Sequence, residues 1–272
     1  MRPEIHGTQR YFAWLYSTPP LREPFATLLE LEREICAPAR AALEHEVAHA
    51  RLEWWRGECA RARAGTPAHP LMRSLSAAAQ RLALPLDLSG LVDIATWDLA
   101  CATFASRQEL AGYCARWAAA VTQPALQLAL PHAQPRAAEL GRTLGAALKE
   151  LELLTELDRE ARAGRLRLPL DELAAAAIDT GAVSHPPWSE PLTALLAGRF
   201  KVLRAELAAS IAALTAQERG AVRGMIVWAE LAGRHAARAA AALPHAWQPG
   251  GASRLADAWR SWRAARRASQ AH

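Results

Sequence analysis

The chain has 272 residues, of which 51% are hydrophobic, so it is long enough to bury a substantial core and too apolar to be a disordered segment. Its formal net charge is +5, and Lys149 and Lys201 are the only lysines, so arginine carries the excess. Arginine pairs with phosphates and carboxylates, but an excess this small and scattered does not indicate a nucleic-acid-binding protein.

Other features of the sequence bear on where the protein is found. The four cysteines show no CxxC spacing, and a chain of this size needs no disulfides, so we expect reduced thiols. The N-terminal segment, MRPEIHGTQR, lacks the apolar stretch of a signal peptide, and no run of about 18 uncharged apolar residues follows it. We therefore expect a cytoplasmic protein, and peripheral contact with the inner face of a membrane is an open alternative.

Helical patterns dominate the chain, because the alternation of β-branched and aromatic residues that marks strands is almost absent. The spacing predicts helices over residues 10–17, 24–37, 41–64, 69–83, 88–104, 106–130, 135–163, 170–179, 188–213, 215–241 and 251–268. Pro24 is predicted in the first turn of its helix, and Pro38 is predicted to end it. The connections are short and no linker or repeat divides the chain, so we expect one all-α helical bundle spanning residues 1–272.

The predicted helix at residues 251–268 is both basic and aromatic. It carries two tryptophans and four arginines, namely Trp259, Trp262, Arg260, Arg263, Arg266 and Arg267. A helix of this composition suits the surface of a membrane. In the alternative interpretation the tryptophan face packs on the core, and the arginines lie along the surface with their charged ends in water.

A row of acidic side chains is the first candidate site. Glu152, Glu156 and Glu160 are spaced four residues apart, so they share one face of the predicted helix at 135–163, where like charges repel. Carboxylates at this spacing suit Mg²⁺, which keeps several waters and bridges to substrate phosphates. The alternative is a solvated acidic face that pairs with neighbouring arginines.

The segment His45-Glu46-Val47-Ala48-His49 is a second candidate, because it matches the pattern HExxH. On a helix the two histidines face the same way and bind Zn²⁺, and the glutamate serves as general base of a hydrolase. The third ligand of such sites is missing from the following residues, since Trp55 stands where a metzincin has its third histidine. The alternative is a helix face with packing or capping histidines.

Several segments in order resemble the squalene/phytoene synthase family. These segments are Arg10-Tyr11-Phe12 followed by Tyr16, Pro20 and Arg22, then RLEWWR at 51–56, GTPAHP at 65–70, Phe104 to Cys114, and ARAGRLRLP at 161–169. The resemblance implies an isoprenoid-synthase-type helical bundle with a central cavity. It also implies a Mg²⁺-dependent prenyltransferase that joins two molecules of farnesyl or geranylgeranyl diphosphate head to head. In a cavity, Arg10, Tyr11, Arg22 and Arg165 would hold the diphosphate.

This chain departs from the family pattern at both metal motifs. Glu156 and Glu160 stand where the second DxxxD motif has its aspartates, so the resemblance implies them as Mg²⁺ ligands, and the spacing adds Glu152 to the candidates. The first motif falls near residues 36–40, yet no carboxylate occurs from Ile35 to Leu43. Glu30 and Glu34 lie a turn earlier and are the nearest substitutes.

Three hypotheses about function follow and stay open at this point. The chain is a squalene/phytoene synthase-like protein that binds a prenyl diphosphate. Alternatively, it is a non-catalytic isoprenoid-binding or assembly factor with a protein partner, since the complex I assembly branch of this superfamily loses the same aspartates. The third hypothesis is a metal-dependent hydrolase built on the HExxH segment.

Overall fold

The computed structural model describes residues 8–39, 44–248 and 251–270. In these ranges every regular element is a helix and no strand occurs, which confirms the all-α prediction. The elements are α1 (Gln9–Tyr16), α2 (Pro19–Cys36), η1 (Ala37–Ala39), α3 (His45–Arg63), α4 (Pro70–Gln80), α5 (Ser89–Leu99), α6 (Arg107–Ala120), α7 (Thr122–Ala129), α8 (Gln134–Thr155), α9 (Leu157–Arg162), α10 (Leu170–Ala175), η2 (Thr180–Ser184), α11 (Glu190–Ala212), α12 (Ala216–Ala221), α13 (Arg223–Ala242) and α14 (Gly251–Ser269).

Three of the predicted long helices are each interrupted once. The breaks fall at Val121, Glu156 and Val222, and they separate α6 from α7, α8 from α9, and α12 from α13. Pro124 explains the first break, because proline has no N–H for the carbonyl four residues earlier. The start of α2 also differs from the prediction, since Pro19 and Pro20 occupy its first turn and Pro24 lies inside the helix.

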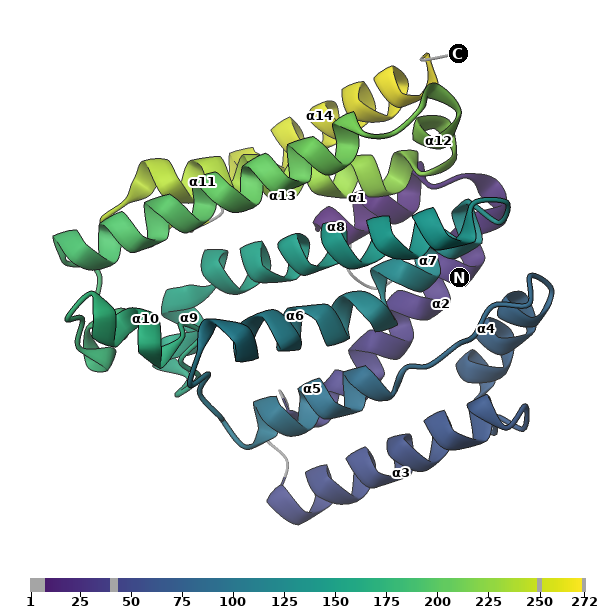
Figure 1. Cartoon of the computed structure of the whole chain (residues 1–272), viewed down its shortest axis with the longest axis horizontal. Coiled ribbons are helices and arrows are strands. Elements are labelled where there is room, and N and C mark those ends of the chain that lie inside the picture. Colours follow the sequence, from purple (N-terminus) through teal and green to yellow (C-terminus); the bar gives the residue numbers. More distant parts are fainter. Residues whose placement is uncertain (1–7, 40–43, 249–250, 271–272) are drawn as a thin grey trace.

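Helix α8 lies at the centre of the bundle, with α6 and α13 on either side of it in Figure 1, and it also packs on α7 and α11. Helices α3, α4 and α5 form one edge of the bundle, which joins the centre through the packing of α5 on α6 and of α4 and α5 on α2. Large side chains fill the interior, and among the least exposed are Trp117, Tyr113, Phe25 and Phe104.

Two glycines let α8 approach its neighbours closely. A Cβ at Gly145 would lie 1.8 Å from the hydroxyl oxygen of Thr122, and a Cβ at Gly141 would lie 2.4 Å from the Cα of Gln123. The Thr122 hydroxyl donates a hydrogen bond of 2.6 Å to the Gly141 carbonyl. The close packing of α7 on α8 therefore depends on glycine in α8.

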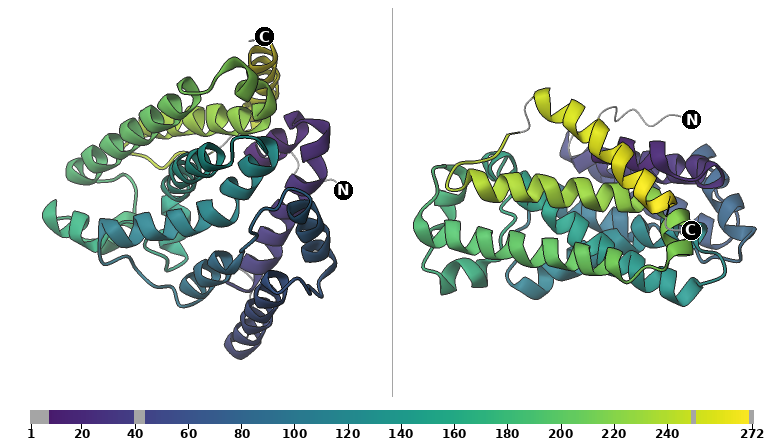
Figure 2. Two further views of the ribbon diagram at one scale, coloured as in Figure 1. Left: turned by 45° about the vertical axis from the view of Figure 1, so that its right-hand side comes forward. Right: turned by 90° about the horizontal axis from the view of Figure 1, so that it is seen from above.

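Helix α14 crosses over α13 and lies near α1, as the second view in Figure 2 shows. Its inner face is made of small or polar side chains, and Asp257 anchors it through His235 on α13 at 2.8 Å. The opposite ring nitrogen of His235 lies 2.7 Å from the Gln9 amide of α1. No helix in the described ranges is long and apolar enough to cross a membrane.

Candidate functional site

An ion-pair network connects α1, α2 and α8 in the middle of the bundle. Arg10 donates through one terminal nitrogen to Glu32 at 2.5 Å and through the other to Glu152 at 2.6 Å. Lys149 donates to the second oxygen of Glu152 at 2.8 Å, and the Trp117 indole N–H donates to the second oxygen of Glu32 at 2.7 Å. We call these five residues the central network.

The central network is enclosed by aromatic side chains. The Arg10 guanidinium lies 5.6 Å from the ring centre of Trp117 and 5.5 Å from that of Trp228, and these two rings pack edge to face. Lys149 lies 5.7 Å from the Trp117 ring centre. Both cations are therefore within the range of cation–π attraction. Glu32 and Lys149 are each only 3% exposed, so water screens their charges weakly.

The charges in the central network balance one another. Arg10 and Lys149 supply two positive charges, and Glu32 and Glu152 supply two negative charges. Burial opposes the charged form of Arg10, but the charges of Glu152 and Glu32 and their hydrogen bonds outweigh this effect and raise its pKa. The arginine is therefore held as a permanent cation between two helices, a position that a metal ion would take in a site built on facing carboxylates.

Glu156 lies next to this network at the break between α8 and α9. Its carboxylate pairs with the more exposed Arg159 at 2.5 Å. Burial raises the pKa of Glu156, and the negative charge of Glu152 raises it further. The positive charges of Arg159 and of Lys149 offset this rise only in part.

Glu160 belongs to a second ion-pair network. It accepts from Arg165 at 2.8 Å and from Arg167 at 3.0 Å, and Arg167 in turn pairs with Asp98 at 2.8 Å. Burial alone would raise the pKa of Glu160, but the hydrogen bonds and charges of the two arginines lower it to about 2. Tyr113 donates its hydroxyl to Asp98 at 3.1 Å, and burial beside that carboxylate raises the pKa of Tyr113 well above its usual value.

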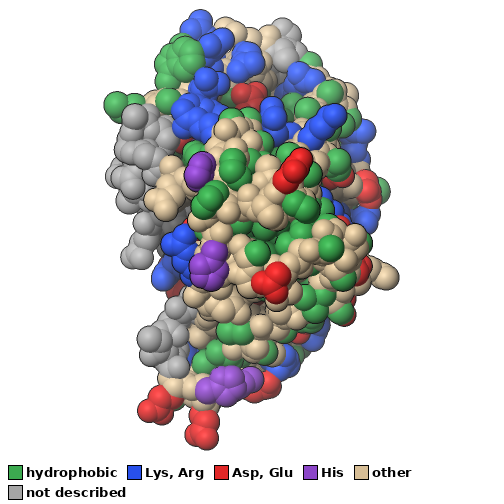
Figure 3. All heavy atoms as spheres, turned by 90° about the vertical axis from the view of Figure 1, so that its left-hand side faces the viewer, with side chains coloured by type: hydrophobic (Ala, Val, Ile, Leu, Met, Phe, Trp, Pro, Cys, Tyr) green, Lys and Arg blue, Asp and Glu red, His purple; other side chains and the backbone are tan. Residues whose placement is uncertain are grey.

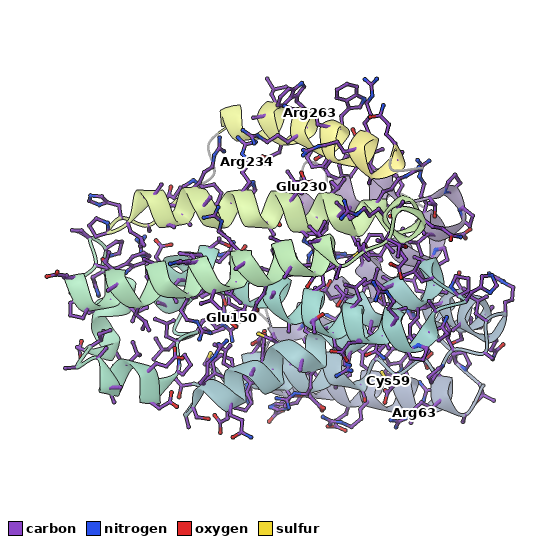
Figure 4. The ribbon with its side chains drawn as sticks, turned by 45° about the horizontal axis from the view of Figure 1, so that its top comes forward. Cys59, Arg63, Glu150, Glu230, Arg234 and Arg263 are labelled. Carbon is purple, nitrogen blue, oxygen red and sulfur yellow. The ribbon has the colours of Figure 1, made fainter. Side chains whose placement is uncertain are left out.

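A third network lies on the other side of α8. Glu150, which Figure 4 labels near the middle of the bundle, is 5% exposed and accepts two hydrogen bonds from Arg107 at 2.8 and 2.7 Å. Arg199 of α11 also donates to Glu150 and lies 3.2 Å from Glu172. This network joins α6, α8 and α11. Its two arginines compensate the charge of Glu150, which explains how this glutamate can be buried.

These contacts test whether the predicted acidic row fits Mg²⁺. Glu152, Glu156 and Glu160 do not form one continuous helical face, because the helix is interrupted at Glu156. Each carboxylate pairs most closely with a different arginine, and Arg159 also lies 3.6 Å from Glu160. Across the described ranges no cluster of three or more His, Cys, Asp or Glu side chains is arranged to hold a metal. Mg²⁺ takes oxygen ligands that are not already neutralised, so the arrangement does not fit it.

The residues predicted to hold a diphosphate do not come together. Arg10 alone lies in the central network. Tyr11 packs at the outer cluster between α1, α13 and α14, and Arg22 donates to the Ser17 and Leu15 carbonyls at the end of α1. Arg165 binds Glu160. Of the four residues that the resemblance implied, Arg10 lies beside the facing carboxylates of Glu32 and Glu152. The other three make separate local contacts.

The HExxH histidines face the same way, as the pattern predicts. The Nε2 atoms of His45 and His49 lie 3.0 Å apart, and both side chains, like that of Glu46, are exposed at the start of α3. No third ligand joins them among the described residues. Glu58, on the same helix, is fully buried and accepts from the backbone N–H groups of Ala68 and His69 at 2.8 and 2.7 Å, so it holds the GTPAHP turn.

The inward carboxylate on α2 is Glu32, and not Glu30 or Glu34, the two expected from the sequence. Glu30 pairs with Arg33 on the same helix, and Glu34 lies 3.3 Å from His69. The sequence held a usable signal, because Glu32 falls on the buried stripe of α2 between Leu28 and Ile35. Lys149 was likewise marked by rarity, as one of two lysines in the chain.

Comparison with known proteins identifies the fold and the family. Residues 5–262 match the family model described as squalene/phytoene synthase. The structure is similar to a dehydrosqualene synthase solved with a ligand, with a TM-score of 0.73, 15% sequence identity, and coverage of 96% of this chain and 90% of that one. It is also similar to the squalene synthase HpnC from Alicyclobacillus acidocaldarius, with a TM-score of 0.65, 17% identity, and coverage of 84% and 86%. No curated protein sequence matches the chain.

The two solved structures share the helical fold at low identity, and the family match extends over nearly the whole chain. The predicted resemblance to this family is thereby confirmed, and so is the predicted isoprenoid-synthase-type fold. The chain belongs to the squalene/phytoene synthase family.

Proposed function

We propose that this chain is a non-catalytic member of its family, which acts as an assembly factor or as a binding protein for a neutral isoprenoid. The observation that carries the proposal is the bridge from Arg10 to Glu32 and Glu152. This bridge supports the proposal because Arg10 supplies, between facing carboxylates, the kind of positive charge that Mg²⁺ would supply in a prenyltransferase.

Charge balance is the physical reason for preferring a neutral ligand. Prenyl transfer needs positive charge to neutralise the departing diphosphate. Arg10 and Lys149 are the cations of the central network, and both are already paired with carboxylates. Glu156 adds a further negative charge beside them. A diphosphate carries several negative charges, so it could pair with Arg10 and Lys149 only by displacing their carboxylates. If it came with metal ions instead, those ions would meet carboxylates that the two cations already neutralise.

A comparison of two ligands tests this proposal. Purified protein is mixed with farnesol or with farnesyl diphosphate, each with Mg²⁺ and with a chelator, and the melting temperature and bound mass are measured by thermal shift and native mass spectrometry. We expect any stabilisation by an isoprenoid to occur with farnesol and to be independent of Mg²⁺. Stabilisation by farnesyl diphosphate that requires Mg²⁺ would contradict the proposal.

A matched variant makes the comparison more specific. Glu152→Gln removes a carboxylate from the central network and leaves Lys149 and Arg10 with an excess of positive charge. If the wild-type network is closed to diphosphate because its charges balance, this variant should bind farnesyl diphosphate more tightly than wild type does. An E152Q variant that loses diphosphate binding present in the wild type would instead identify Glu152 as a metal ligand.

A further inference from the structure

The outer face of α14 carries its largest apolar side chains. Leu255, Trp259 and Trp262 lie at spacings of four and three residues, so they form one stripe, and they are 81%, 53% and 46% exposed. The face that packs on α13 and α1 instead carries small side chains, among them Ala264, Ala265 and Ala268. The expectation that the tryptophan face packs on the core is therefore wrong, because alanines fill that position.

Arginines surround this apolar stripe. The Arg263 guanidinium lies 4.6 Å from the ring centre of Trp259, and that of Arg266 lies 5.3 Å from the ring centre of Trp262. Arg260, Arg263 and Arg266 pair with no carboxylate in the part of the chain that the structure describes. In Figure 3 lysine and arginine side chains gather at the top of the molecule, the end at which α14 lies.

A cavity of about 220 Å³ opens between α13 and α14. Its polar lining includes Arg234, Arg260, Arg263 and Arg267, with Glu230 as its carboxylate. Figure 4 labels Glu230 and Arg234 on α13 and Arg263 on α14, on the two helices that border this cavity. Arg267 lies 3.4 Å from Glu230 and Arg234 lies 3.2 Å from Asp257, so two of the four arginines have a carboxylate partner and the cavity keeps an excess of positive charge.

Arg234 shows that this positive charge is not fully compensated. Its terminal nitrogen lies 3.2 Å from Asp257, yet that buried nitrogen makes no hydrogen bond among the described residues. Burial lowers the pKa of Arg234, and the positive charges of Arg238 and Arg260 lower it further. A phosphate group in the cavity would supply both the missing acceptor and the missing negative charge.

Charge and shape together favour one kind of occupant. Exposed tryptophans flanked by arginines are typical of helices that lie in the headgroup region of a bilayer, with the aromatic rings at the apolar boundary and the cations among the phosphates. A protein partner of the usual kind would cover the apolar stripe without needing a phosphate-sized basic cavity beside it. We propose that the α13–α14 face docks on an anionic lipid bilayer, with Leu255, Trp259 and Trp262 at the boundary and a lipid phosphate in the arginine-lined cavity.

Co-sedimentation with vesicles tests this docking surface in the full chain. We expect binding to vesicles of phosphatidylglycerol and phosphatidylcholine, weak binding to vesicles of pure phosphatidylcholine, and loss of binding at high salt. Each arginine near an anionic surface contributes about fivefold to the affinity, so Arg260→Gln, Arg263→Gln and Arg266→Gln together should weaken binding roughly 100-fold. Trp259→Ala with Trp262→Ala should weaken it roughly tenfold while leaving its salt dependence in place.

A control variant removes the same charge from other helices. Arg51, Arg81 and Arg116 are exposed on or beside α3, α4 and α6, so their triple replacement by Gln should leave vesicle binding within about twofold of wild type. Equal loss in the two triple variants would overturn the proposal, because binding would then follow net charge alone. Stabilisation by inorganic phosphate without binding to anionic vesicles would also overturn it, since the cavity would then serve a free anion.

Discussion

Replacing Arg10 by methionine tests the central network most severely, because it removes the cation and keeps most of the side-chain volume. Glu32 would then retain only the Trp117 N–H among the contacts described above, at 3% exposure, whereas the more exposed Glu152 would keep Lys149. Breaking a buried ion pair by removing one partner costs about 3–5 kcal/mol. Since Glu152 keeps a partner, we expect the lower end, a loss of about 3 kcal/mol in the free energy of unfolding.

Urea unfolding followed by circular dichroism measures this loss, and thermal unfolding should show a melting temperature lower by roughly 6–12 °C. The matched control is Arg142→Met, because Arg142 and Glu139 form an ion pair in which both side chains are more than half exposed. That control should cost about 0–1 kcal/mol. The double variant Arg10→Met with Glu32→Gln should recover part of the loss, since no charge is then left unpaired in the interior. Equal losses for R10M and R142M, or no recovery in the double variant, would refute the reasoning.

Two further predictions concern Glu160 and the close packing of α8. The pKa of Glu160 is lowered to about 2 from its ordinary value of 4.5, so its ion pairs stabilise the folded chain above about pH 4.5 and this contribution, about 3 kcal/mol at most, is lost as the pH falls towards 2. Glu160→Gln should remove that part of the pH dependence in urea unfolding, and parallel curves for variant and wild type would count against the assignment. Gly145→Ala should cost about 1–3 kcal/mol, because its Cβ would lie 1.8 Å from the Thr122 hydroxyl oxygen. Gly198→Ala on α11 is the control: nothing lies within 4 Å of its Cβ, so it should stabilise the chain by about 0.5–1 kcal/mol, and a similar loss for both glycines would contradict the packing argument.

Local patterns in the sequence were sufficient to predict the helices. Helix-forming residues, prolines and glycines mark the starts and ends of most elements, and the break before Pro124 was readable from the proline itself. The breaks at Glu156 and Val222 carry no such signal, because neither lies beside a proline or a glycine that forces an end. Helix α9 packs on η2 and helix α13 packs on α1, and no local pattern in the sequence specifies these contacts.

The candidate site was less predictable, because its contacts join residues far apart in the chain. Arg10 and Glu152 are separated by 142 positions, and a single sequence gives no measure of which distant charges meet. The sequence did show that the first motif lacks its carboxylates, since none occurs from Ile35 to Leu43. The buried stripe of α2 indicates that Glu32 faces inward. The sequence could not predict that Arg10 would bridge Glu32 to Glu152, because that contact depends on the packing of α1 between α2 and α13.

Two parts of the molecule differ in charge and in exposure. The central network is internally neutral and closed by tryptophans, whereas the α13–α14 face is basic and exposed. Binding of an anion is therefore expected at the outer face rather than in the middle of the bundle. The vesicle assay and the isoprenoid assay examine these parts independently, so a negative result in one leaves the other intact.

Release of diphosphate is the most direct test of the claim that Arg10 takes the place of a metal. Purified full-length chain is incubated with farnesyl or geranylgeranyl diphosphate and Mg²⁺, and free diphosphate is measured over time. The account predicts release at the rate of a sample without protein, with either substrate. Mg²⁺-dependent release that is abolished by Glu152→Gln would contradict it, because Glu152 would then be acting as a metal ligand in a working prenyltransferase.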